Sequence, residues 1–210
     1  MKSLHKQVVS KRTYKLLQDI TQNRYFKEFY LVGGTALALQ IGHRVSEDLD
    51  FFSQDEFKSN IIKKIKKSHE IVSLHDNSIE VIIENTKVFF FYFAFPLLNK
   101  IRKTESIRMA DPIDIGLMKL LALQGRTTKK DIIDLYFIDK EVIELEDLLE
   151  RFEKRYPKES FNSYKSLKTL LDYSSLDSEK LPRVIKRVNW KKVSDLVSSK
   201  VSKHLKKFTH

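Results

Sequence analysis

Two aspartates, Asp48 and Asp50, are separated by a single leucine in the run Asp48-Leu49-Asp50-Phe51-Phe52. In an extended strand, alternate side chains point to opposite faces, so both carboxylates share one face while Leu49 points to the core. Neighbouring carboxylates repel each other unless a cation lies between them. Hard divalent cations such as Mg²⁺ take oxygen ligands and often share a site with substrate phosphates. The pair therefore predicts a Mg²⁺ site, with exposed acids at a strand end as the alternative.

A glycine pair, Gly33-Gly34, precedes the aspartates and lies between a predicted strand and a predicted helix. Glycines at this point allow a tight turn and let a ligand approach the backbone amides. The free N–H groups and positive dipole end of the helix suit a phosphate, and Thr35 can add a hydroxyl. Phosphate donors beside a metal-binding carboxylate pair are what phosphoryl or nucleotidyl transfer needs. For the glycines alone, an ordinary strand-to-helix turn is the alternative.

Arg44 and Ser46 lie in the turn that leads into the aspartates. We expect Arg44 to brace Asp48 or Asp50, and direct contact with a phosphate is the alternative. The six histidines of the chain form no cluster with the spacing of metal ligands.

A second candidate group lies in the C-terminal half. Lys119 stands among leucines and a methionine in the predicted helix of residues 113–123. A charge there is explained if it faces an anionic triphosphate across a cleft that it shares with Asp48 and Asp50. A surface lysine whose stem lies along the helix is the alternative.

Asp131 and Asp134 are three residues apart and share one face of the next predicted helix. They could orient Lys119 or Arg126, or activate an attacking hydroxyl. Acids that merely favour the first turn of a helix are the alternative.

The elements that must position these residues differ between the two halves. In the first half, hydrophobic periodicity predicts helices at residues 14–29, 35–41 and 58–67 and strands at 29–32, 48–52, 71–74, 78–83 and 87–95. From residue 111 the pattern is helical, at 113–123, 129–139, 145–156, 161–173 and 190–208, with Thr127 or Thr128 as a cap. We expect an α+β fold: a mixed sheet with flanking helices in residues 1–105, joined near 99–110 to a helical half in residues 106–210.

The composition excludes several classes of site and of protein. The absence of cysteine excludes disulfide scaffolds, thiol nucleophiles and Cys-ligated metals, and fits a reducing cytoplasm. With 41% hydrophobic residues, the chain can form a packed core. The most apolar run, residues 88–95, is far shorter than the roughly 20 residues that span a membrane. No apolar segment follows the first residues, so we expect no secretory signal and a soluble, cytoplasmic protein.

The formal net charge of +11 is concentrated at the C-terminus. Residues 181–210 contain one acid, Asp195, and nine basic residues: Arg183, Lys186, Arg187, Lys191, Lys192, Lys200, Lys203, Lys206 and Lys207. Such a basic tail attracts polyanions, nucleic acid above all. A solvated helix end that keeps the protein soluble is the alternative.

Together these residues resemble a known family. The runs Leu31-Val32-Gly33-Gly34-Thr35-Ala36-Leu37-Ala38-Leu39 and Arg44-x-Ser46-x-Asp48-Leu49-Asp50-Phe51-Phe52 are similar to the signature of the AbiEii-type nucleotidyltransferases. These are toxins of type IV toxin–antitoxin and abortive-infection systems. A second block, residues 114–126 followed by 130–136, matches that family in kind and order. The resemblance spans roughly residues 30 to 140.

The resemblance implies a nucleotidyltransferase-like fold and Mg²⁺-dependent transfer of a nucleoside monophosphate from an NTP to a hydroxyl. RNA, for instance a tRNA 3′ end, is the expected acceptor, with a protein acceptor as the alternative, and a cognate antitoxin is a possible partner. The implied roles are metal binding by Asp48 and Asp50, nucleotide binding by Gly33, Gly34, Thr35, Arg44, Ser46, Lys119 and Arg126, and catalysis by the aspartate pair with Lys119 and Asp131, supported by Asp134.

One departure from the superfamily concerns the third metal carboxylate, which many members place on a later strand. The predicted strand at residues 87–95 has no acid, although Glu80 and Glu84 on the preceding strand could substitute. A weakened metal site would fit the second hypothesis, a nucleotide-binding or antitoxin-interacting module without catalytic turnover.

Overall fold

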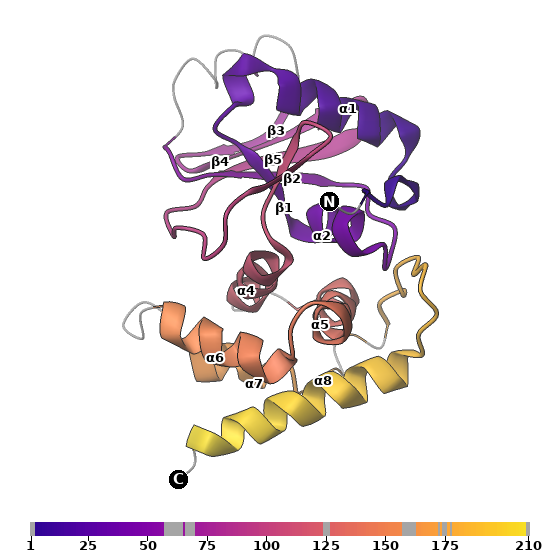
Figure 1. Cartoon of the computed structure of the whole chain (residues 1–210), viewed down its shortest axis with the longest axis vertical. Coiled ribbons are helices and arrows are strands. Elements are labelled where there is room, and N and C mark those ends of the chain that lie inside the picture. Colours follow the sequence, from indigo (N-terminus) through magenta and orange to yellow (C-terminus); the bar gives the residue numbers. More distant parts are fainter. Residues whose placement is uncertain are drawn as a thin grey trace. The chain divides into compact units, whose positions relative to one another are not determined.

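The structure, a computed structural model, describes residues 3–56, 65, 70–123, 127–156, 163–171, 173, 176 and 178–208. Arg126 and most of the helix predicted at residues 58–67 lie outside the described residues. The chain forms two compact units, Met1–Asp111 and Pro112–His210, where we had expected a boundary between residues 105 and 106 (Figure 1). Within the described ranges, every helix is too short or too polar to cross a membrane.

The N-terminal unit is built on a seven-stranded mixed sheet with the order β3-β4-β5-β2-β1-β7-β6. The strands are β1 (Tyr30–Val32), β2 (Leu49–Ser53), β3 (Glu70–His75), β4 (Ser78–Ile83), β5 (Thr86–Tyr92), β6 (Arg102–Thr104) and β7 (Ile107–Met109). The central strand β2 is antiparallel to β1 and parallel to β5. The β6–β7 hairpin lies in the segment that we had expected to be a connection. The sequence did not indicate it because strands of three residues give no periodicity signal.

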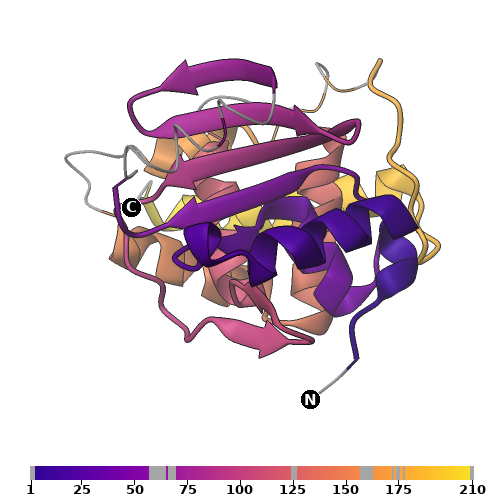
Figure 2. The ribbon, with the colours of Figure 1, turned by 90° about the horizontal axis from the view of Figure 1, so that it is seen from above.

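Helices lie on both faces of this sheet. Helix α1 (Lys11–Gln22) lies across one face and α2 (Gly33–Ile41) on the other, and the short 3-10 helices η1 (Lys6–Val8) and η2 (Arg24–Phe26) flank α1 (Figures 1 and 2). Ser10 caps α1 by accepting a hydrogen bond from the Thr13 amide. The helix predicted at residues 14–29 therefore starts and ends earlier than expected.

Aromatic packing closes the face of the sheet that carries Phe51 and Phe90. Both rings are fully buried and stack with centroids 5.4 Å apart. Phe26 and Phe29 cover Phe90, with centroids at 5.0 Å and 5.1 Å. Because side chains alternate along β2, Asp50 must point to the opposite face of the sheet.

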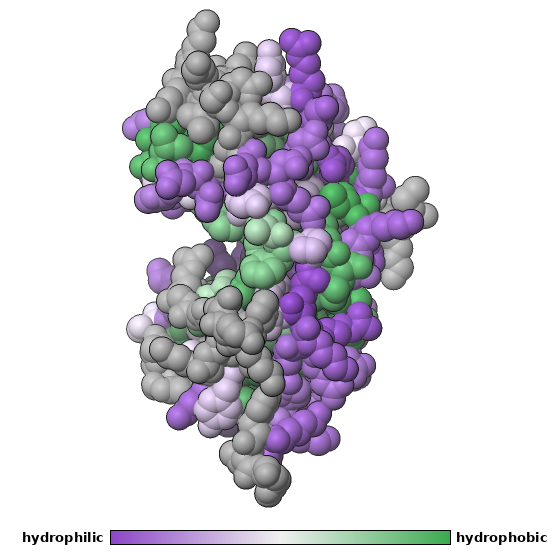
Figure 3. Space-filling view, turned by 90° about the vertical axis from the view of Figure 1, so that its left-hand side faces the viewer, coloured by the Kyte–Doolittle hydropathy of each residue, from purple (hydrophilic) through white to green (hydrophobic). Residues whose placement is uncertain are grey.

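The edge of the sheet at β3 exposes apolar side chains. Val72, Leu74 and Ile82 of the β3–β4 hairpin are 51%, 39% and 42% exposed. A shift in register between Ile71 and Ser73 interrupts the pairing of β3 with β4. Figure 3 shows apolar side chains reaching the surface of the N-terminal unit beside hydrophilic ones.

The C-terminal unit is helical, as predicted. Its helices are α4 (Pro112–Ala122), α5 (Lys129–Glu141), α6 (Leu145–Arg155), α7 (Ser163–Lys168) and α8 (Trp190–Leu205), which continues into η4 (Lys206–Phe208). Helix α4 packs against α5, α6 and α7, and α8 packs against the same three helices. Ile115, Leu148, Phe152 and Val197 are fully buried in this core.

Candidate active site

The two aspartates occupy the start of the central strand. Strand β2 begins at Leu49, which is fully buried, whereas Asp48 just before it is exposed and Asp50 is partly exposed. The alternation along β2 puts Asp50 on the face of the sheet opposite to Leu49 and Phe51. That Asp48, just before the strand, shares this face stays a prediction. The strand keeps the pair in place because its other face is anchored in the aromatic core.

The glycine pair lies directly against these residues. Asp50 is the cross-strand partner of Val32, the last residue of β1, so the turn that follows β1 lies beside the Asp50 carboxylate. Gly33 has φ +66°, and a Cβ there would lie 2.3 Å from Oδ2 of Asp50. At Gly34 a Cβ would lie 2.2 Å from Nη2 of Arg44. The positive φ and the close approach of Asp50 require glycine at position 33, so the N-terminus of α2 lies against the Asp50 carboxylate.

Thr35 and Ser46 hold the turn that presents Asp48. The Thr35 hydroxyl donates to the backbone carbonyl of Asp48 and lies 2.8 Å from Oγ of Ser46. Its side chain is buried, with 1% exposure. Thr35 thus fixes the loop between α2 and β2, and this positions Asp48 relative to the glycine turn.

Arg44 is buried at the N-terminal end of α2. Its side chain is 3% exposed, its guanidinium lies against Gly34, and Nη1 donates to the carbonyl of Val45 at 3.1 Å. The guanidinium therefore adds a fixed positive charge at the end of the helix that already carries a positive dipole. The predicted bracing of Asp48 or Asp50 stays a prediction.

Strand pairing brings Lys87 to the site, a residue that the sequence did not single out. Strand β5 runs parallel to β2 with Leu49 opposite Val88 and Asp50 opposite Phe89, so Lys87 comes one residue before this paired stretch, on the face of β5 that carries Phe89. Lys87 is 63% exposed, and its ammonium lies 3.3 Å from a carboxylate oxygen of Glu80.

The same pairing identifies the side chains at the positions where a third metal-binding carboxylate was expected. Phe89 of β5 is the cross-strand neighbour of Asp50, and Glu80 of β4 is the neighbour of Phe89. Glu80 is thus about 10 Å from Asp50, two strand spacings away, with an aromatic ring between them. Glu84 lies in the β4–β5 turn with φ 49°.

In the helical unit, Lys119 of α4 is held by both predicted aspartates. Its ammonium lies 2.6 Å from Oδ2 of Asp134 and 3.1 Å from Oδ1 of Asp131. Lys119 is 9% exposed and the Asp134 carboxylate is completely buried, so the alternative of a surface lysine does not hold. Asp131 also completes a capping box with Thr128 at the start of α5. The carboxylates fix the direction of the ammonium, since a charge-assisted bond on each side restrains it.

With this geometry established, the chain can be compared with known proteins. Residues 15–101 match the family described as "Nucleotidyl transferase AbiEii toxin, Type IV TA system". The uncharacterized protein aq_aa25 of Aquifex aeolicus (strain VF5) is 30% identical over 205 residues, which cover 94% of this chain and 98% of that protein. The chain belongs to the AbiEii nucleotidyltransferase toxin family.

Solved structures share the fold of this AbiEii chain. JHP933 from Helicobacter pylori matches with a TM-score of 0.61 at 22% identity, covering 98% of this chain and 94% of that one. MenT4, a nucleotidyltransferase toxin from Mycobacterium tuberculosis H37Rv, matches with a TM-score of 0.53 at 14% identity, covering 94% and 86%. The predicted family and α+β fold are confirmed, and the chain is a nucleotidyltransferase toxin of this family.

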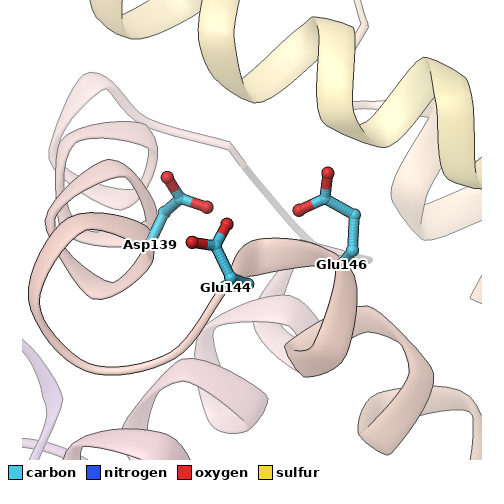
Figure 4. A group of neighbouring side chains, drawn as sticks. All are labelled: Asp139, Glu144 and Glu146. Carbon is cyan, nitrogen blue, oxygen red and sulfur yellow. The ribbon is translucent and has the colours of Figure 1, made fainter.

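The AbiEii chain also has an acidic cluster in its helical unit, formed by Asp139, Glu144 and Glu146. One carboxylate oxygen of each lies within 4.8 Å of the others, and the three groups point toward one another beneath α8 (Figure 4). Such an oxygen set could hold a metal. However, the Lys200 ammonium of α8 lies 2.5 Å from Asp139, 2.5 Å from Glu144 and 2.9 Å from Glu146. The cluster therefore already has its cation.

The ionisation of this cluster follows from that contact. Burial is the largest influence on Asp139 and would raise its pKa, but bonds from Lys200, the Leu145 amide and Lys140 outweigh it and hold the pKa below its usual value. The Glu146 pKa is likewise lowered by Lys200 against the effect of burial. Burial would lower the Lys200 pKa, yet its three carboxylates raise it. Asp139, Glu146 and Lys200 therefore stay charged at neutral pH.

The basic C-terminal segment is partly neutralised by acids from α5 and α6. The contacts pair Lys186 with Glu141 at 2.6 Å, Lys207 with Glu150 at 2.9 Å and His204 with Glu153 at 2.8 Å. A count of charges along the sequence could not reveal these pairs, because they join residues about fifty positions apart. The positive surface of the AbiEii chain is therefore smaller than its C-terminal composition indicates.

Proposed function

We propose that this chain transfers a nucleoside monophosphate from an NTP to a hydroxyl acceptor with the help of Mg²⁺. The observation that carries the proposal is the juxtaposition of Asp48 and Asp50 with the Gly33-Gly34 turn at the N-terminus of α2. The carboxylates of Asp50 in β2 and of the exposed Asp48 just before it are the hard oxygen donors that Mg²⁺ takes. The glycine turn and the helix N-terminus supply amide donors for phosphate oxygens.

The chemistry is an in-line displacement at phosphorus. The acceptor hydroxyl oxygen bonds to the α-phosphorus, the bond between the α-phosphorus and its bridging oxygen to the β-phosphate breaks, and pyrophosphate leaves with the electron pair. The hydroxyl proton passes to water. When bound by Asp48 and Asp50, Mg²⁺ supplies positive charge that stabilises the developing negative charge. The glycine amides and Arg44 orient the phosphates, while Thr35 and Ser46 hold the loop that carries Asp48.

Lys119 is proposed to neutralise triphosphate charge, with Asp131 and Asp134 holding its ammonium in one direction. Two short contacts to carboxylates keep the ammonium of this lysine ordered before a nucleotide arrives. Arg126 is proposed to bind nucleotide on the strength of the family resemblance alone.

An RNA acceptor, for instance a tRNA 3′ end, is proposed from the positive charge near the C-terminus. Arg183, Arg187 and Lys192 are exposed and offer charges for phosphate contacts. If they bind RNA, glutamate at Arg183 and Arg187 should reduce the slope of log K against log salt by about one for each lost contact. The matched control is Lys207→Glu, since the Lys207 charge is already paired with Glu150. Equal slopes in all variants would exclude this surface as the RNA contact.

The test of the reaction is incubation with each α-labelled NTP, Mg²⁺ and total RNA, followed by gel electrophoresis. We expect label on an RNA species with at least one NTP, and none after addition of EDTA or with Asp48→Ala. Binding of an NTP without transfer of label to RNA or protein would favour the second candidate, a nucleotide-binding or antitoxin-interacting module. The aromatic residue at position 89, in place of an acid, is the observation that favours this second candidate.

A further inference from the structure

Three phenylalanine rings share the sheet face that carries Asp50. Phe89 lies directly opposite Asp50, and Phe91 lies directly opposite Phe52 in the same parallel pair of strands. Because side chains alternate, these rings point away from the buried core formed by Phe51 and Phe90. This face of β2 and β5 therefore carries the Asp50 carboxylate with aromatic rings beside it and further along the strands.

The rings form an ordered apolar surface, which we call the phenylalanine shelf (Phe52, Phe89 and Phe91). The Phe89 and Phe91 rings are nearly parallel, with centroids 5.9 Å apart and an angle of 14° between their planes. Phe52 lies 5.2 Å from Phe91 and 5.2 Å from Phe93, which is buried. Packing against Phe93 thus helps to fix the Phe52 ring of the shelf.

Exposure distinguishes the shelf from the aromatic core on the other face. Phe51 and Phe90 are 1% and 0% exposed, whereas all three shelf rings keep intermediate exposure. Six of the seven positions from Phe89 to Phe95 are aromatic. If all six side chains were buried, core packing alone would explain them. Of the partly open rings, Phe89 and Phe91 share the sheet face of Asp50.

We propose that the phenylalanine shelf binds the nucleobase of the NTP by stacking, an inference that rests on the proposed function. Phe89 is one strand spacing, about 5 Å, from Asp50, and Phe91 is about 7 Å further along β5. Phosphates engaged at Gly33, Gly34 and Asp50 would place the base, one ribose away, over these rings. Continuity with the carboxylate pair thus selects a nucleotide as the occupant of the shelf.

Stacking on phenylalanine sets a definite specificity. Every base has a π-face, so stacking tolerates all four bases and distinguishes a nucleotide from a bare polyphosphate. The shelf is therefore expected to contribute affinity for the base without strong preference among ATP, GTP, CTP and UTP.

The experiment measures Mg²⁺-dependent binding of the four NTPs and of inorganic tripolyphosphate by calorimetry. Phe89→Leu and Phe91→Leu keep apolar volume but remove the ring, and each should weaken NTP binding about tenfold while leaving tripolyphosphate binding unchanged. Phe89→Tyr keeps the ring and should bind NTP like the parent. Asp48→Ala should weaken binding of both ligands. Thermal unfolding of each variant checks that the fold is intact.

The possible outcomes distinguish failure of the shelf proposal from failure of the proposed function. If both leucine variants bind every NTP like the parent while Asp48→Ala does not, the shelf proposal is wrong and the proposed function stands. Loss of affinity for an unstructured RNA oligonucleotide, with NTP affinity unchanged, would also overturn the proposal, because the rings would then hold the acceptor. Failure of the parent protein to bind any NTP would instead refute the proposed function.

Discussion

Two groups of carboxylates in the described part of the chain differ in what lies beside them. In the helical unit, Asp139, Glu144 and Glu146 surround the ammonium of Lys200 at 2.5–2.9 Å. In the N-terminal unit, Asp48 is exposed at the start of β2, beside a turn whose glycines leave space for backbone approach. Carboxylates that surround a lysine of their own fold contribute structure, whereas the exposed Asp48, close to the phosphate donors of the glycine turn, is suited to chemistry.

The largest effect is expected where the acidic pair is changed. Asp48→Ala should lower nucleotidyl transfer by at least about 10²-fold, since charge stabilisation by a metal is worth several kcal/mol. Its urea midpoint should match the parent's within error because Asp48 is exposed. The control is Asp147→Ala, an exposed acid in the helical unit, which should keep full activity. Parental activity in the Asp48 variant would refute the metal assignment.

At the acidic cluster we expect a loss of stability without a loss of nucleotide binding. Lys200→Met leaves the Asp139 carboxylate, 1% exposed, without its main cation, and should cost about 3–5 kcal/mol of unfolding free energy in urea titrations. Nucleotide binding by the remaining folded protein should be unchanged. Lys191→Met removes an exposed pair with Asp195 and should stay within about 0.5 kcal/mol of the parent. A similarly small loss in the Lys200 variant would mean that the cluster stabilises little.

Variants of Lys119 test whether a buried ion pair can contribute both to stability and to nucleotidyl transfer. Lys119→Ala should reduce transfer by about 1.5–3 kcal/mol of transition-state stabilisation, and Lys119→Arg should restore only part of it. It should also destabilise the helical unit, because Asp134 is fully buried. The double variant Lys119→Ala with Asp134→Asn should recover stability but not transfer. Recovery of both would make Lys119 a structural residue only.

Acid should affect the cluster before it affects the rest of the helical core. The pKa values of Asp139 and Glu146 are lowered in the folded state, so their stabilisation is present above the unfolded values of about 3.9 and 4.3 and is lost as pH falls through the folded values. The urea concentration at the midpoint of unfolding should therefore decrease as the pH is lowered below about 4. In Lys200→Met this dependence should weaken, so its difference from the parent should shrink in acid; a constant difference would contradict the assignment.

Local patterns predicted the parts of the site that local physics determines. Alternation around Leu49 indicated the shared face of the two aspartates, and the strand–glycine–helix order indicated the turn at Gly33. Helical spacing put Asp131 and Asp134 on one face of a helix, and Thr128 was one of the two caps expected for it. Each of these needs only a few consecutive turns or strand residues, so a single sequence is sufficient.

Other features depend on pairing between distant segments. Nothing local to Lys87 or Phe89 shows that β5 pairs parallel with β2, so neither residue could be placed beside the aspartates. The neutralisation of Lys207 by Glu150 is equally non-local. The β6–β7 hairpin was missed because three-residue strands have no measurable period.

The irregular pairing at the sheet edge bears on how the protein behaves when concentrated. A regular outer strand with exposed apolar side chains is a template on which a second chain can add as a further strand. Strand β3 has such side chains, Val72 and Leu74, but the register shift between Ile71 and Ser73 bends its hydrogen-bonding edge. The bulge thus acts as a guard against intermolecular strand addition, and straightening it would favour fibrous self-assembly before it affected any step of catalysis.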